Sequence, residues 1–184
     1  SMSLVEIKKA AEEMIEEMEV DPKTGEKPVE VTTGPKGVTI GISSDISFKS
    51  GSAATVPGIM PILEKIAPTI KSSNFQVAVE GHTDSQQLPE GHQYQGNWDL
   101  SGARAAAVVR LLIQLGVSPT RLQAVGFGEY VPRDKLTTEL IDVELIKKYN
   151  SDETQMKRNR RVEITFLAPR GGPTGMTTVE AEKG

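Results

Sequence analysis

The chain has 184 residues, no cysteine and a formal net charge of −4 at pH 7. This length suits one compact domain with appendages, and it is enough for a hydrophobic core that needs no covalent staple. The lack of cysteine excludes disulfides, thiolate metal sites and a cysteine nucleophile. Acidic and basic residues are mixed, so no broad basic surface is predicted and nucleic acid is not an expected partner.

The first predicted element is an amphipathic helix within residues 1–20. Its apolar residues recur at alternating spacings of three and four, and they are Leu4, Ile7, Ala11, Met14 and Met18. The helix either packs on its own domain or pairs with its twin in a dimer, although two heptads are too short to hold a dimer alone. Residues 21–37, rich in Pro, Gly, Lys and Thr, predict a linker or a surface excursion.

Residues 38–168 alternate between strand and helix patterns. In chain order we expect a strand at 38–42, a helix at 56–70 that Pro61 and Pro68 bend or shorten, a strand at 75–79, a helix at 100–115, a strand at 122–127, a helix at 137–150 and a strand at 162–166. This order predicts an α/β fold, a βαβαβ-β two-layer sandwich with helices packed on a mixed four-stranded sheet. Residues 169–184, rich in Gly, Pro, Thr and Glu, predict a disordered tail.

One acidic and one basic residue are the main candidates for a binding site. Asp84 comes just past the end of a predicted strand, where open α/β sheets often hold ligands. Arg104 lies within about two turns of the start of the next helix, where its guanidinium can bind a carboxylate through two hydrogen bonds. Together they fit a small zwitterion, with its ammonium near Asp84 and its carboxylate near Arg104. The alternatives are a plain salt bridge between the two, or two unrelated solvated charges.

Neighbouring residues have simpler interpretations. Asn97 is expected to cap or stabilise the start of the helix, and Trp98 is expected to pack there. Arg160 and Arg161 precede the final strand, where charged side chains protect a sheet edge from pairing with other chains.

Enzymatic chemistry finds little support in the sequence. A glycosidase needs two carboxylates about 5 to 9.5 Å apart, and the available acidic residues form no recognised pair. His82 and Asp84 could form half of a metal site, but no third ligand stands at a convincing spacing. No nucleophile elbow is present either. We therefore expect no enzyme, no metal and no cofactor.

Four sequence blocks resemble the signature of OmpA-like peptidoglycan-binding domains. They appear in the family's order over roughly residues 38–168, and together they make a strong match. The blocks are Gly81-His82-Thr83-Asp84, Asn97-x-x-Leu100-Ser101-x-x-Arg104-Ala105, Gly126-x-Gly128-Glu129-x-x-Pro132 and Asn159-Arg160-Arg161-Val162-Glu163-Ile164.

The resemblance implies an OmpA-like fold and a noncovalent peptidoglycan site. In such domains an Asp and an Arg of the first two blocks hold the diaminopimelate of the stem peptide, which implies these roles for Asp84 and Arg104. The groove would also be lined by residues from the same blocks, which are Thr83, Asn97 and Leu100. Arg161 is a weaker candidate, because it can support the pocket without touching the ligand.

The sequence Asn-Trp-Asp-Leu-Ser at 97–101, the long loop from Ser85 to Gly96 and the preceding helix are similar to MotB-type flagellar stator proteins. This implies a homodimer that joins a MotA-type membrane subunit and anchors the motor to the wall. The chain would be the periplasmic domain of an inner-membrane-anchored protein, without its anchor. The alternative is the wall-anchoring domain of an outer-membrane porin or a Pal-type lipoprotein, with no motor role. The segment from Asp134 to Gln155 is longer than the family's usual connection, which leaves the local loop geometry open.

Overall fold

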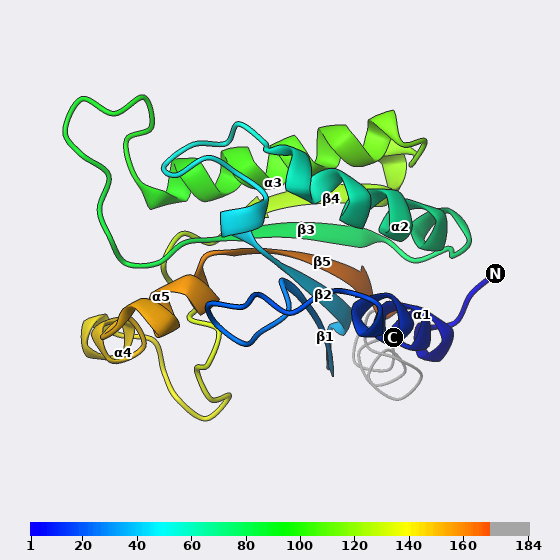
Figure 1. The fold of residues 1–184 in the computed structure, drawn as a ribbon, viewed down its shortest axis with the longest axis horizontal. Helices are drawn as coiled ribbons and strands as arrows, with labels where there is room; N and C mark the ends of the chain where they lie inside the picture. The colour runs from blue at the N-terminus through cyan, green and yellow to red at the C-terminus, as the bar shows by residue number, and fades with distance from the viewer. Residues whose placement is uncertain (170–184) are drawn as a thin grey trace, which may run out of the picture.

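The computed structural model describes residues 1–169, in which five strands form one mixed sheet and helices lie over one of its faces (Figure 1). The β3–β4 pair is parallel and the other pairs are antiparallel. Most of the tail predicted for residues 169–184 lies outside the described residues, from residue 170 onward. The strands follow the order β1-β2-β5-β3-β4, with bounds β1 Val29–Gly34, β2 Gly37–Ser43, β3 Val77–His82, β4 Leu122–Gly126 and β5 Arg161–Leu167.

Alternation along the central strands sends their apolar side chains to the helix-covered face. Ile40 on β2 is the register partner of Ile164 on β5, which in turn is the partner of Val79 on β3. All three side chains are fully buried, as the period of two requires for one face of a sheet. The predicted two-layer α/β sandwich is confirmed, and its four predicted strands are all present.

Helices α2 (Met60–Lys71) and α3 (Asn97–Gln114) form much of the second layer. Pro61 lies in the first turn of α2, where its missing N–H has no intrahelical partner to lose, and Pro68 lies three residues before the end. Gly116 adopts a φ of +97° just after α3, a left-handed conformation that ends the helix without steric cost. Among the helices of residues 1–169, none has the length and apolar character that a membrane span requires.

The N-terminal helix α1 (Leu4–Glu16) packs on its own domain, which is the first of the two alternatives for it. Ile7 and Ala11 are buried against β1, β2 and α2. A reciprocal capping box between Ser3 and Glu6 starts the helix, and the Lys27 Nζ donates to the carbonyl of Ile15 at 2.8 Å near its end. The apolar seam is therefore covered within the chain, and dimerisation stays a prediction.

The prediction of a linker or surface excursion at 21–37 is wrong. This segment contains strand β1. This strand pairs with β2 through a short turn at Pro35, which makes the sheet five-stranded and not four-stranded. The strand pattern is weak because Val29 and Val31 are its only apolar residues. Its other side chains are partly or fully exposed, as suits an edge strand.

The single helix predicted at 137–150 is also wrong. Two shorter helices occupy this region, α4 (Val143–Lys148) and α5 (Glu153–Asn159). Each begins at an aspartate whose side chain accepts a backbone N–H at 2.8 Å, Asp142 for α4 and Asp152 for α5. These two N-caps were the sequence signal that could have separated the helices.

Helix α3 lies unusually close to the sheet at one point, and this contact positions the candidate site. Gly81 on β3 and Gly126 on β4 are register partners, and both face the first turns of α3. A Cβ at Gly81 would overlap the carbonyl oxygen of Ser101, and one at Gly126 would lie 2.5 Å from the backbone nitrogen of Gly102. The absence of these side chains brings the start of α3 beside the loop that follows β3.

Candidate functional site

A cavity of about 690 Å³ opens where β3 ends. Its walls come from the segment after β2, the loop after β3, the first turns of α3, and the junction of α5 and β5. This volume falls within the roughly 300–1,000 Å³ that is usual for small-molecule sites. The lining residues that bear on its chemistry are Asp45, Asp84, Leu100, Arg104, Glu153 and Arg160.

Asp84 is a buried carboxylate whose two oxygens are both engaged. It is 6% exposed. Its Oδ1 accepts the backbone N–H of Gln86 at 2.9 Å, and its Oδ2 accepts Nη1 of Arg160 at 2.7 Å. The hydrogen bond from Gln86 holds the carboxylate at the start of the loop that follows β3. The end of this strand therefore places Asp84 in the cavity wall.

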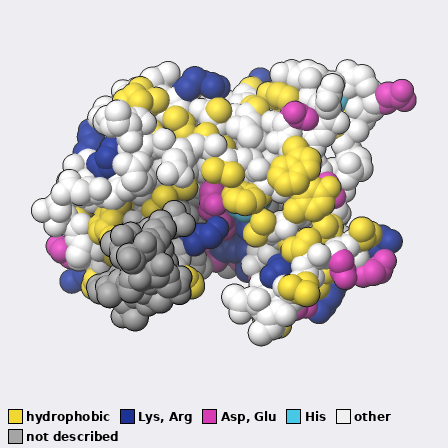
Figure 2. All heavy atoms as spheres, turned by 180° about the vertical axis from the view of Figure 1, so that it is seen from behind, with side chains coloured by type: hydrophobic (Ala, Val, Ile, Leu, Met, Phe, Trp, Pro, Cys, Tyr) yellow, Lys and Arg dark blue, Asp and Glu magenta, His cyan; other side chains and the backbone are white. Residues whose placement is uncertain are grey.

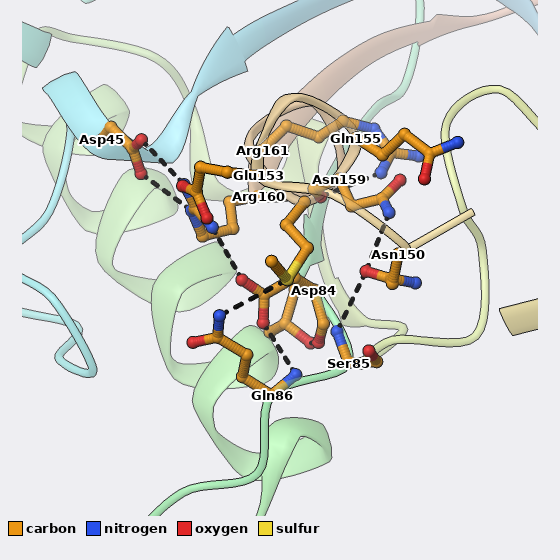
Figure 3. A network of polar contacts seen from close by, with 12 residues as sticks. Asp45, Asp84, Ser85, Gln86, Asn150, Glu153, Gln155, Asn159, Arg160 and Arg161 are labelled. Carbon is orange, nitrogen blue, oxygen red and sulfur yellow. Dashed lines mark hydrogen bonds and ion pairs between the residues drawn. The ribbon is translucent and has the colours of Figure 1, made fainter. Parts of the chain in front are cut away.

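Arg160 is the centre of an acidic cluster, shown in Figure 3. Besides Asp84, it donates to Asp45 at 3.0 and 3.2 Å and to Glu153 at 2.6 Å. Burial disfavours its charged form, but the hydrogen bonds to these three carboxylates outweigh burial and raise the pKa of Arg160. Three carboxylates thus share one guanidinium, which leaves this end of the cavity with an excess of negative charge.

Arg104 forms the opposite, basic part of the wall. It is 5% exposed, and its guanidinium lies over the ring of Phe48 at 4.9 Å from the centroid. Its Nε donates to the carbonyl of Ser52 at 2.8 Å and its Nη2 to that of Lys49 at 3.2 Å. Burial lowers the pKa of Arg104, although the nearby carboxylates of Asp45 and Asp84 act in the opposite sense.

The two predicted key residues line one cavity but do not pair with each other. Within residues 1–169 the salt bridge of Asp84 goes to Arg160, and Arg104 forms none. The alternative of a plain Asp84–Arg104 salt bridge is therefore wrong. The Nη1 of Arg104 has no hydrogen-bond partner in the described part of the chain, so this guanidinium retains capacity for an anionic group.

The remaining residues from the first two blocks hold the wall together. The Thr83 hydroxyl donates to the carbonyl of Asp84 at 2.8 Å, and Leu100 is buried beneath the cavity. Asn97 does not act as the N-cap of α3, because that position falls on Gly96. Its side-chain amide instead donates to the carbonyl of Gln86 at 3.0 Å and, over a longer distance, to the backbone carbonyl of Asp84. It therefore braces the loop that carries Asp84.

Arg161 points away from the cavity, and its neighbour Arg160 lines it. The Nε of Arg161 donates to Glu163 at 2.8 Å, and its other nitrogens donate to the carbonyls of Asn159 and Val131, each at 3.0 Å. Adjacent residues in extended chain point to opposite sides, so only one of the two arginines can face the cavity. Edge protection does not describe either, since both sit in ion-pair networks next to a central strand.

Trp98 packs at the start of α3, as expected, but on the surface of the protein. It is 56% exposed and stacks on Tyr130 at a centroid distance of 4.9 Å. Although Trp98 follows Asn97 directly in the chain, it lies on the outer side of α3 and does not line the cavity.

Sequence reasoning missed two charged cavity residues, Asp45 and Glu153, and it assigned Arg160 a different role. Glu153 comes from the long segment between Asp134 and Gln155. The same segment steadies the Asp84 loop, because the side chain of Asn150 accepts the backbone N–H of Ser85 at 3.1 Å (Figure 3). The extra length is therefore part of the site's structure. The Asp152 N-cap, which fixes the start of α5, was the signal that could have placed Glu153.

Comparison with known proteins gives a consistent result. A model of the OmpA family matches residues 47–142. Motility protein B of Bacillus subtilis is 28% identical over 154 residues, which cover 83% of this chain and 53% of that protein. The peptidoglycan-associated lipoprotein of Pseudomonas aeruginosa is 33% identical over 117 residues, which cover 64% of this chain and 58% of the lipoprotein.

Among solved structures, the periplasmic domain of Helicobacter pylori MotB (residues 78–256) superposes with a TM-score of 0.67 at 22% identity, covering 85% of this chain and 92% of that chain. At this identity the likeness shows a shared fold. The chain spans little more than half the length of the two curated relatives described above.

Proposed function

Because this chain belongs to the OmpA family, we propose that it binds peptidoglycan noncovalently, through the free end of a diaminopimelate residue in the stem peptide. The observation that carries the proposal is the placing of Asp84 and Arg104 in one cavity without a salt bridge between them. A diaminopimelate end carries an ammonium and a carboxylate on one carbon. These two groups match the acidic and basic parts of the cavity.

In this proposal the ligand ammonium binds at the acidic cluster. Asp45, Asp84 and Glu153 supply three carboxylates against the single charge of Arg160, so a further cation is favoured there. The ligand carboxylate binds Arg104, whose contacts to backbone carbonyls leave its charge without an acidic partner in the described residues. Thr83, Asn97 and Leu100 shape the cavity and hold its loop.

The binding serves anchoring and not cleavage. Two of the cavity carboxylates, Asp45 and Asp84, are tied to Arg160, which makes them poor candidates for a proton donor and a nucleophile. The proposal therefore includes no enzymatic activity and needs no cofactor.

We further propose that the anchored assembly is a flagellar stator. Motility protein B of Bacillus subtilis is among the relatives, and the fold is shared with the periplasmic domain of Helicobacter pylori MotB. The chain would then be a periplasmic domain that acts as a homodimer with a MotA-type membrane subunit. A dimer gains avidity for a wall that repeats the same stem peptide. The lipoprotein relative favours the alternative, wall anchoring by a porin or Pal-type protein without a motor role.

Co-sedimentation with purified sacculi tests the wall-binding proposal. The chain is expected to pellet with sacculi that contain diaminopimelate, and free diaminopimelate is expected to release it. 1,5-Diaminopentane is the matched competitor, because it keeps both ammonium groups of diaminopimelate but lacks both carboxylates. Equal release by 1,5-diaminopentane, or no pelleting, would contradict the proposed site. Loss of sacculus turbidity would contradict binding without cleavage. Restoration of swimming to a non-motile strain by the full-length gene would separate the stator role from the lipoprotein alternative.

A further inference from the structure

A second cluster of ionisable residues lies on the sheet face opposite the helices. Glu80 and His82 on β3 are the register partners of Glu163 and Arg161 on β5, so their four side chains share one face. One imidazole nitrogen and one oxygen from each of the two glutamates lie within 4.8 Å of one another. Figure 2 shows the molecule from behind, with a hollow in which acidic, basic and histidine side chains meet.

The imidazole of His82 is buried without a hydrogen bond. It is 2% exposed, and neither of its ring nitrogens has a hydrogen-bond partner among the described residues. Stacking on Phe127, with ring centroids 5.2 Å apart, fixes the plane of the ring. Its Nε2 stands 3.5 Å from Oε1 of Glu163, which is too long for a normal hydrogen bond. Buried polar groups nearly always have a hydrogen-bond partner, so an imidazole without one needs an explanation, such as a bound ion.

The negative charges of Glu80 and Glu163 are only partly balanced by close cations. Glu80 and Glu163 face each other directly across the strand pair, an arrangement that is destabilising for like charges. Arg161 binds Oε2 of Glu163 at 2.8 Å, which leaves Oε1 towards His82. Glu80 is 8% exposed, yet its nearest cation is Lys36 at 3.9 Å, whose own side chain is 72% exposed. Lys36 is thus the loosely held cation of the cluster, and an incoming cation can take its place beside Glu80.

From this geometry we propose that Glu80, His82 and Glu163 bind a divalent transition-metal ion, with Zn²⁺ as the best match. Mixed imidazole and carboxylate donors suit zinc, and three protein ligands leave a fourth position for water. Two ligands of a tetrahedral zinc ion, each about 2.0–2.1 Å from the metal, lie about 3.3 Å apart. The 3.5 Å between His82 and Glu163 is close to this value. Glu80 moves the remaining distance, and the exposed Lys36 swings away.

The surroundings are compatible with this role. Burial, assisted by the charge of Arg161 and opposed by Glu163, lowers the pKa of His82 to about 4. An imidazole binds metals in its neutral form. Arg161 would remain on the outer oxygen of Glu163 and hold the ligating carboxylate in place. The ion would join β3 to β5 on the face that the helices leave uncovered.

Titration of the chelator-treated chain with Zn²⁺ tests this site. Binding of one equivalent is expected, with Tm raised by about 5–10 °C when zinc is at one hundred times its Kd. Mg²⁺, which prefers six oxygen ligands, is expected to give no such rise. The variants His82→Asn and Glu163→Gln are each expected to lose the zinc effect, whereas His92→Asn, which changes the other histidine, should keep it.

Titration with Co²⁺ makes the result independent of the variants' folding. The wild-type chain should give the intense visible absorption of a four-coordinate cobalt site, and one equivalent of Zn²⁺ should abolish it. The proposal is overturned if the wild type shows no zinc-dependent rise in Tm, or if His82→Asn and Glu163→Gln fold and keep the rise. A cobalt spectrum typical of six-coordinate aqueous ion would overturn it as well.

Discussion

Asp84→Asn and Arg104→Ala are each expected to weaken sacculus binding by at least about tenfold while the chain stays folded. Each change removes the charged partner of one end of the proposed ligand, and a hydrogen bond to a charged group contributes about 1.5–3 kcal/mol. Asp84→Asn keeps the side-chain shape, and Arg160 still has Asp45 and Glu153 as partners. Binding isotherms on sacculi measure the loss, and circular dichroism checks the fold.

Two neighbouring charges on α3 serve as matched controls for these variants. Asp99 and Arg110 belong to the same helix, are exposed and do not line the cavity. Asp99→Asn and Arg110→Ala repeat the same changes of charge and are expected to bind like the wild type. Equal weakening by the controls would point to a general effect of charge. Wild-type binding by both Asp84→Asn and Arg104→Ala would remove the basis of the proposed site.

Gly81→Ala is expected to destabilise the domain by about 3 kcal/mol. The added methyl group would overlap the carbonyl oxygen of Ser101, which is backbone and cannot swing aside. Helix α3 would have to shift away from β3, together with Asn97 and Arg104. Urea denaturation followed by circular dichroism measures the change in the free energy of unfolding, and sacculus binding should weaken along with it.

Gly102→Ala, on the α3 side of the same contact, is expected to have the opposite effect on stability. A Cβ at Gly102 meets nothing within 4 Å, and the residue lies inside α3. Replacing a helical glycine with alanine is expected to stabilise the domain by up to about 1 kcal/mol. If Gly81→Ala were as stable as the wild type, the close approach of α3 to the sheet would be contradicted. A large destabilisation by Gly102→Ala would argue against the orientation of α3.

The sequence by itself determined the elements whose periodicity is strong. Alternating apolar residues placed the four main strands, and the polar stretch after Gly81 marked the loop that carries Asp84. The same reading brought Asp84 and Arg104 to one groove, because a strand end and the start of the next helix must meet in such a fold. Local pattern was sufficient here, since each of these elements buries one regular face.

Only the tertiary structure decided what depends on pairing between distant segments. Strand β1 is stabilised by its hydrogen bonds to β2 more than by its own apolar residues, so its pattern was too weak to predict it. The choice of Arg160 over Arg161 for the cavity depends on where α5 ends and β5 begins. Glu163 reaches His82 because two strands far apart in sequence lie side by side. Register and side-chain direction follow from long-range contacts, and residue spacing along the chain does not encode them.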